Sequence, residues 1–276
     1  MSTAVATPTR HTSLGHLTFP RVVRSEWIKF RTLRSTFWSY AIVLVLGVGL
    51  TALVAFSFPE SQVSQMPDAA KAGFVSSTAL FGVYFGQLIV AVLGVLAISG
   101  EYSTGMIRSS FAAVPRRTPI FVAKSIVLFV SSFVVGIVTT LAGYAIAGPV
   151  LSGKGFPVDI TQSDTVWAIL GAGAYLGLVS VFALGLGTLL RSAAGGIAAA
   201  LGVVFLLPII VSILHGLLST VDWLGDVPKY LISNAGQAMA GGGGTTFNPW
   251  QNVLVVVVWT AVSFIAGAII MKRRDA

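Results

Sequence analysis

The chain has 276 residues, of which 55% are hydrophobic and only 9% are charged, and its mean hydropathy is +0.89. This composition excludes an ordinary soluble domain. The absence of cysteine excludes disulfide bonds, thiolate catalysis and thiolate metal sites. A net charge of +8 suits a nucleic-acid-binding protein as well as a membrane protein, so the distribution of the charges has to decide.

Six apolar runs are long enough to cross a bilayer, since a hydrocarbon core of about 30 Å requires roughly 20 helical residues. They cover residues 37–58, 79–99, 120–147, 165–189, 194–216 and 250–271. The sequence therefore predicts an all-α integral membrane protein with a six-helix transmembrane domain over residues 37–271. Apart from Lys124, these runs contain no Asp, Glu, Lys or Arg. Charged groups at mid-bilayer mark ion and proton handling, so ion-coupled transport is disfavoured.

The basic residues are divided unequally between the two sides that six spans define. Fourteen belong to one side and three to the other. The first set is Arg10, Arg21, Arg24, Lys29, Arg31, Arg34, Arg108, Arg116, Arg117, Lys124, Arg191, Lys272, Arg273 and Arg274, and the second is Lys71, Lys154 and Lys229. By the positive-inside rule both termini are expected in the cytoplasm. Because topology and contact with anionic lipids account for the charge, no nucleic-acid partner is expected.

The first 36 residues contain no membrane-spanning run and lack the apolar core of a signal peptide, so we expect no cleaved leader. Residues 1–19 are expected to form a disordered cytoplasmic tail, and residues 272–276 a basic cytoplasmic tail. Residues 20–36 predict an amphipathic helix with Val23, Trp27, Phe30 and Leu33 on its apolar face.

A basic helix of this kind belongs in the cytoplasmic membrane interface, where Trp27 and Phe30 are buried among lipid head groups. Arg24 and Arg31 then face lipid phosphate. The helix is either a juxtamembrane anchor or a contact for a partner protein, and the sequence leaves both open.

Two pairs of glycines, Gly82 with Gly86 and Gly173 with Gly177, are spaced one helical turn apart. This spacing favours close packing of helices within the bundle. Residues 217–249 form an unusually long connection that mixes aromatic residues with a four-glycine run. It is either a flexible external loop or a short re-entrant hairpin, and its apolar content favours the hairpin.

Motifs of catalytic or nucleotide-binding proteins are missing or incomplete. Residues 148–154 match the first seven positions of a phosphate-binding loop, but Gly155 replaces the Ser or Thr that would hold magnesium. His215 follows Ser212 by three residues without a nucleophile elbow or an acidic third member. The histidines do not form a metal-ligand cluster. The sequence therefore predicts neither an enzyme nor a bound cofactor or metal.

Residues 99–105, between the second and third spans, form an acidic, glycine-containing segment that continues into the arginine-containing residues 106–117. Gly100 and Gly105 are expected to let the chain leave the membrane and turn, while Glu101 offers a carboxylate to a partner or to a helix N-terminus. Arg108, Arg116 and Arg117 are expected to bind lipid phosphate or acidic partner groups. The alternative is an ordinary cytoplasmic turn whose charges only fix the topology.

Three passages resemble the six-span permease subunits of bacterial type-2 ATP-binding-cassette (ABC) exporters. They are Ser25–Thr36 (SEWIKFRTLRST), Ser99–Arg108 (SGEYSTGMIR), and Val114–Arg117 (VPRR) leading into Ala123–Lys124. The resemblance covers nearly the whole chain in order and spacing. Met106 departs from it, because threonine is usual at that position of the pattern.

This resemblance implies that the segment between spans two and three couples the permease to a separate ATPase. The segment comprises Ser99, Gly100, Glu101, Tyr102, Ser103, Thr104, Gly105 and Arg108. It also implies a bacterial plasma membrane location and a second permease, either another copy or a paralogue. ATP and magnesium would be bound by the ATPase subunits. The alternative function is a membrane-embedded sensor or immunity protein that binds a peptide or lipid without pumping it.

Overall fold

The computed structural model describes residues 18–63, 65–107, 117–157, 161–218, 221–242 and 247–273. Within these ranges the chain is helical and contains no strand. Six stretches are long and apolar enough to cross a membrane, which confirms the all-α, six-span fold. They are Arg34–Ser57, Gly73–Ser103, Arg117–Gly153, Ser163–Leu190, Ala193–Leu217 and Pro249–Arg273.

The first half of the chain supplies three spans and the helices between them. In chain order its elements are α1 (Phe19–Thr32), α2 (Arg34–Ser57), α3 (Glu60–Val63), α4 (Asp68–Ala79), α5 (Phe81–Ser103) and α7 (Arg117–Gly153). The second span consists of the end of α4 and all of α5, joined at Leu80. It extends to Ser103, so the sequence-based end at residue 99 is too early.

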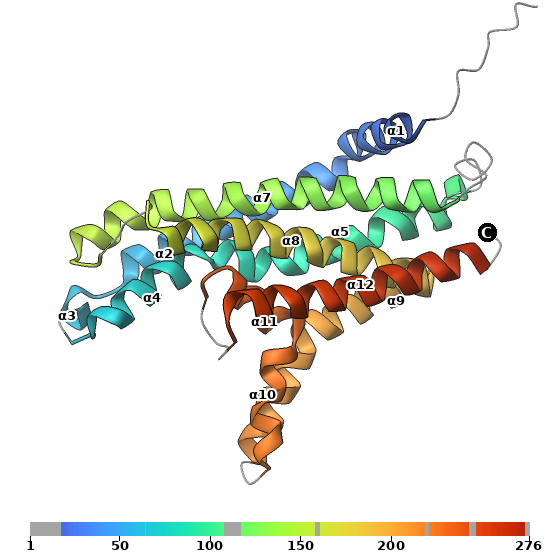
Figure 1. Cartoon of the computed structure of the whole chain (residues 1–276). Coiled ribbons are helices and arrows are strands. Elements are labelled where there is room, and N and C mark those ends of the chain that lie inside the picture. The colour runs from blue at the N-terminus through green and yellow to red at the C-terminus, as the bar shows by residue number, and fades with distance from the viewer. Residues whose placement is uncertain are drawn as a thin grey trace, which may run out of the picture.

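The second half of the chain contains α8, a fifth span that is divided into several helical segments, and a connection of short helices before the last span. Its elements are α8 (Ser163–Leu190), α9 (Ala193–Leu201), the π-helical turn η1 (Gly202–Leu206), α10 (Leu207–Leu217), the 3₁₀ turns η2 (Asp222–Gly225) and η3 (Val227–Tyr230), α11 (Ile232–Met239) and α12 (Pro249–Arg273). Figure 1 shows α9 running along the bundle while α10 points away from it. The chain changes direction at η1. A π-turn interrupts the regular hydrogen bonding of an α-helix and allows it to bend there.

The core of the bundle is built around α8, which packs against α5, α7 and α12. Small residues allow these close contacts. A Cβ atom added to Gly173 would lie 2.8 Å from the carbonyl oxygen of Phe133 on α7, and one on Gly82 would lie 2.2 Å from Thr139 Cγ2. The other glycines of the two pairs, Gly86 and Gly177, also lie against neighbouring helices, beside Leu176 and Phe129.

Part of the long connection before the last span is packed into the bundle. Trp259 on α12 donates its indole N–H to the carbonyl oxygen of Tyr230, with a distance of 2.9 Å. Trp259 lies ten residues into α12, about 15 Å along its axis at 1.5 Å per residue. On α11, Gly236 lies directly against the Tyr175 ring of α8. Of the two alternatives that the sequence left open, the described residues therefore favour the re-entrant segment.

Candidate functional site: a buried ion network at one end of the bundle

The packed face of α1 is formed by Val22, Glu26 and Phe30, which follow one another at intervals of four residues. This spacing puts them on one side of a helix, and that side packs against α7. Trp27 remains 39% exposed. The sequence-based face is therefore only partly right, because it omitted Glu26, the charged residue in the middle of the buried side.

Two details of the predicted interfacial helix are wrong. The helix ends at Thr32 instead of continuing to residue 36, because Leu33 has an extended backbone (φ −76°, ψ 118°) and Arg34 begins α2. Leu33 is thus outside the helix and exposed. Phe30 is buried within the protein rather than among head groups, since it belongs to a core cluster with Ile98 of α5 and Phe121 of α7.

The end of α5 also differs from the expectation. Gly100 is helical, and its carbonyl oxygen accepts hydrogen bonds from the hydroxyls of Ser103 and Thr104 at 3.0 and 2.8 Å. Gly100 therefore does not turn the chain. The turn occurs at Gly105, whose φ of +72° is a conformation that favours glycine. Continuation of the helix places Glu101 inside the packed bundle.

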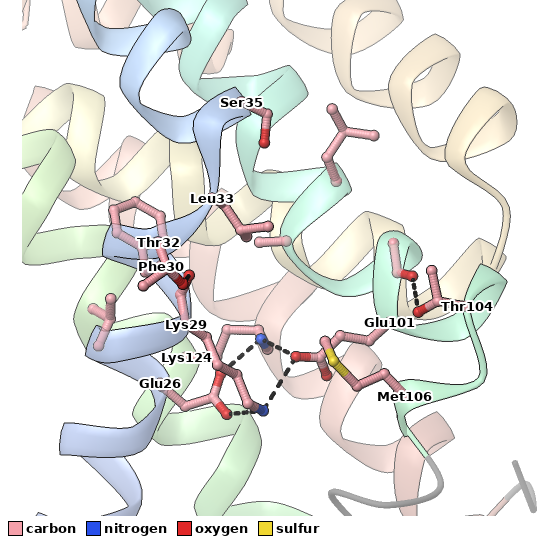
Figure 2. Close-up of a pocket in the computed structure, with 14 residues that line it drawn as sticks. Glu26, Lys29, Phe30, Thr32, Leu33, Ser35, Glu101, Thr104, Met106 and Lys124 are labelled. Atoms are coloured by element: carbon pink, nitrogen blue, oxygen red, sulfur yellow. Dashed lines mark hydrogen bonds and ion pairs between the residues drawn. The ribbon is translucent and has the colours of Figure 1, made fainter.

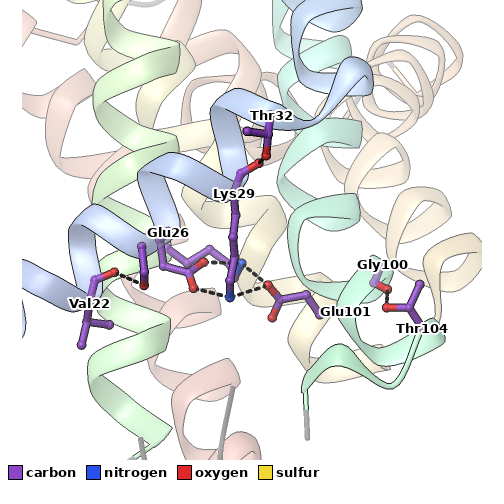
Figure 3. Close-up of polar contacts among 9 residues, drawn as sticks. Val22, Glu26, Lys29, Thr32, Gly100, Glu101 and Thr104 are labelled. Carbon is purple, nitrogen blue, oxygen red and sulfur yellow. Dashed lines mark hydrogen bonds and ion pairs between the residues drawn. The ribbon is translucent and has the colours of Figure 1, made fainter. Parts of the chain in front are cut away.

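Four charged side chains from α1, α5 and α7 meet at this point, as Figure 2 and Figure 3 show. Lys124 Nζ lies 2.7 Å from Glu26 Oε2 and 2.9 Å from Glu101 Oε1. Lys29 Nζ lies 2.7 Å from Glu26 Oε1 and 3.5 Å from Glu101 Oε1. The side chains of Glu26, Glu101 and Lys124 are less than 10% exposed, and that of Lys29 is 33% exposed. We call these four residues the ion network.

The network combines two carboxylates with two ammonium groups, so its formal charge is balanced. Burial by itself raises the pKa of Glu26, but the attraction and hydrogen bonds of Lys124 and Lys29 outweigh burial and lower that pKa. Burial likewise lowers the pKa of Lys29, and its contacts with Glu26 and Glu101 more than reverse this. Both shifts favour the charged forms. The network therefore holds α1, α5 and α7 together electrostatically.

A cavity of about 760 Å³ lies beside the network. Figure 2 shows Phe30, Leu33 and Met106 around it together with the charged residues. Most of its wall is apolar, and Glu26, Lys29, Glu101 and Lys124 lie at its charged side. A cavity of this size with a few converging polar groups is typical of a small-ligand site.

Other sequence-predicted site residues surround this end of the bundle. The guanidinium of Arg117 donates to the carbonyl oxygen of Met271 near the end of α12, with a distance of 3.2 Å. The guanidinium of Arg191, which has a left-handed backbone (φ 50°), lies 5.2 Å from the centre of the Tyr102 ring. Arg24 and Arg31 are exposed on α1. Arg108 and Arg116 lie outside the described residues.

The ion pairs within the ion network were not expected from the sequence. From the sequence, Lys124 counts only among the basic residues of the cytoplasmic side, and Glu101 is expected to meet a partner or a helix N-terminus, whereas the two side chains are paired within the chain. The sequence does contain a signal for this pairing, because a lysine within an apolar membrane span requires an acidic partner. The sequence contains only nine acidic residues, of which Glu26 and Glu101 flank membrane spans on the same side as Lys124.

A chain with six apolar helices can be compared with known families. The family model described as ABC-2 family transporter protein matches residues 21–276. The chain belongs to this family. A comparison with curated proteins gives no significant match. ABC-2 proteins of this kind are the transport component in the membrane and typically work with an ATPase subunit, so the six helices here support a permease subunit.

Proposed function

We propose that this ABC-2 protein is the permease subunit of an exporter in a bacterial plasma membrane. It forms the translocation path with a second permease, which is another copy or a paralogue. Separate ATPase subunits bind ATP and magnesium and drive the transport. Family membership and the six apolar helices support this assignment.

The observation that carries the proposal is the attachment of residues 99–107 to two other elements. Glu101 lies in the last turn of α5 and is bonded to Lys124 of α7 and Lys29 of α1. Immediately after it, Thr104, Gly105 and Met106 are exposed at the end of the bundle. A force applied by an ATPase to this exposed coupling segment would therefore reach α1, α5 and α7 together.

The exposed part of the segment provides the test. Met106 is 43% exposed, and replacing it with Asp would place a charge on the proposed ATPase contact. The matched control is Gln65→Asp, an exposed position between α3 and α4, at the opposite end of the bundle. Permease variants are purified with the partner that carries a phosphate-binding loop, identified by mass spectrometry, and ATP hydrolysis is measured in liposomes.

Met106→Asp is expected to lower the amount of co-purified ATPase and its stimulation by at least tenfold, whereas Gln65→Asp leaves both unchanged. Equal losses in the two variants, or none in either, would contradict coupling through this segment. An ATPase that binds the wild-type chain but drives no movement of any cargo would favour a sensor instead of a pump.

A further inference from the structure

One carboxylate oxygen of the ion network receives no hydrogen bond from the residues that the structure describes. Glu101 Oε1 accepts from both Lys124 and Lys29, whereas Oε2 is buried and, among the residues that the structure describes, receives no hydrogen bond. A buried carboxylate oxygen without a donor is destabilising, because the desolvation of the charge is not compensated. The position of Glu101 therefore indicates a donor from outside the described part of the chain.

The cavity beside Glu101 has the character of an amphiphile site. Its wall combines the charged network with apolar side chains from three helices, among them Phe30, Leu96 and Val127. Figure 2 shows the Glu101 carboxylate beside Met106 at one side of this space, with Phe30 and Leu33 farther along it. A ligand that fits both parts carries a hydrogen-bond donor at one end and a hydrocarbon chain at the other.

We propose that the cavity binds one phospholipid whose head group carries N–H donors, such as phosphatidylethanolamine. Its ammonium group donates to Glu101 Oε2, and one acyl chain follows the apolar wall between α1 and α5. A zwitterionic head group suits the network because the two carboxylates and two ammonium groups are already balanced. Phosphatidylcholine has the same charge but no N–H, so it cannot supply this hydrogen bond.

A membrane lipid is favoured over a soluble amine by the position of α1. This helix exposes Trp27 together with Arg24 and Arg31, the combination found in helices that lie among head groups. The cavity is formed partly by the other side of the same helix. The inference rests on the membrane location given in the proposed function, but it requires no ATPase.

The experiment uses the purified full-length chain without an ATPase, reconstituted in nanodiscs. The probe is phosphatidylethanolamine with a photoactivatable diazirine in one acyl chain, and labelled peptides are mapped by mass spectrometry. We expect labelling of the peptides around Leu96 and Phe30. Unlabelled phosphatidylethanolamine is expected to compete at least tenfold better than phosphatidylcholine. Equal competition by the two lipids would overturn the proposal, and so would equal displacement by ethanolamine, which would indicate a soluble amine.

Two variants test the atoms involved. Glu101→Gln replaces the acceptor Oε2 with an amide that can only donate from that position, and it should abolish the preference for phosphatidylethanolamine. Glu26→Gln removes a carboxylate from the same network but leaves Glu101 Oε2 in place, so the preference should persist. An unchanged preference in Glu101→Gln would refute the assignment. Loss of the preference in both variants would attribute the effect to the network as a whole and would contradict a specific hydrogen bond to Glu101 Oε2.

A third variant tests the cavity without altering a charge. Ala97 lines the cavity, and Ala97→Phe should reduce site labelling at least tenfold. Leu53→Phe, at a residue of α2 that is 61% exposed, is the control and should leave labelling unchanged. Full labelling of Ala97→Phe would contradict binding in this cavity. The competing explanation is a donor within residues 108–116, which lie outside the described residues. If it occupied Oε2, the wild-type chain would show no head-group preference.

Discussion

Lys124 Nζ lies 2.7 Å from Glu26 Oε2, so a lysine within the third membrane span is neutralised by a carboxylate on the helix that precedes the first span. Both side chains are less than 10% exposed. The two residues are 98 positions apart in the sequence, so this is a long-range contact. The contact fixes α1 against α7 next to the proposed coupling segment. The position of α1 therefore depends on Glu26 and Lys124 both being charged.

Removing Lys124 should destabilise the protein strongly. Among the described residues, Lys124→Met leaves buried Glu26 and Glu101 paired with Lys29 alone, and losing one partner of a buried ion pair costs about 3 to 5 kcal/mol. The double variant Glu26→Gln/Lys124→Met should be less destabilised than the sum of the single variants. Thermal unfolding of the detergent-solubilised chain, followed by tryptophan fluorescence, measures both effects. Additive losses would mean that the two residues do not interact.

Acidification should weaken the attachment of α1. The pKa of folded Glu26 lies below its ordinary value of 4.5, because Lys124 and Lys29 outweigh the opposing effect of burial. A lowered pKa means that Glu26 contributes stability above about pH 4.5, and that this contribution is lost as the pH falls through the folded value. The difference in melting temperature between wild type and Glu26→Gln should therefore shrink from pH 6 towards pH 3. A constant difference over this range would contradict the ion pair.

The two aromatic residues of α1 should respond differently to truncation. Phe30 is buried in the core and only 9% exposed, so Phe30→Ala should cost about 3 kcal/mol or more through the cavity that it leaves. Trp27 is 39% exposed, so Trp27→Ala should change the stability in detergent much less. In liposomes, a variant with Trp27 as its single tryptophan should be protected from aqueous iodide. Free quenching of its fluorescence would exclude burial among head groups.

The packing of α11 predicts contrasting effects of two glycine substitutions. A Cβ atom on Gly236 would lie 1.9 Å from the Tyr175 ring, so Gly236→Ala should cost about 1 to 3 kcal/mol. Gly216 in α10 has no atom within 4 Å of the corresponding position, and Gly216→Ala should be neutral or stabilising by up to about 1 kcal/mol. Melting temperatures of the two variants test this. Equal effects would show that α11 does not pack on Tyr175 in the membrane.

Cysteine labelling tests the membrane orientation, since the natural chain has no cysteine. Ser61→Cys and Ser163→Cys should react with a membrane-impermeant maleimide from outside the cell. Ser103→Cys, at the exposed end of α5, should react only after the membrane is permeabilised. The uneven distribution of Lys and Arg motivates this orientation. External labelling of Ser103→Cys would reverse it.

The sequence by itself determined the number of spans and the protein family. Hydropathy is a local property of the sequence. Each membrane helix satisfies its backbone hydrogen bonds internally and needs its own run of about 20 apolar residues to cross the bilayer. The six predicted runs therefore match the six observed helices to within a few residues at most ends. The passages near Glu26 and Glu101 identified the family in the same way, through short motifs that require no knowledge of distant contacts.

Only the tertiary structure decided which charged residues face one another. At about 100° per residue, the helical period places Glu26 beside Phe30 and about 100° away from Trp27, but it does not tell whether the side with Glu26 or the side with Trp27 meets the protein. That choice depends on the energy of pairing Glu26 with Lys124, a residue on a separate helix. The course of α5 through Gly100 was similarly decided by packing, which keeps Glu101 within reach of Lys124 and delays the turn until Gly105.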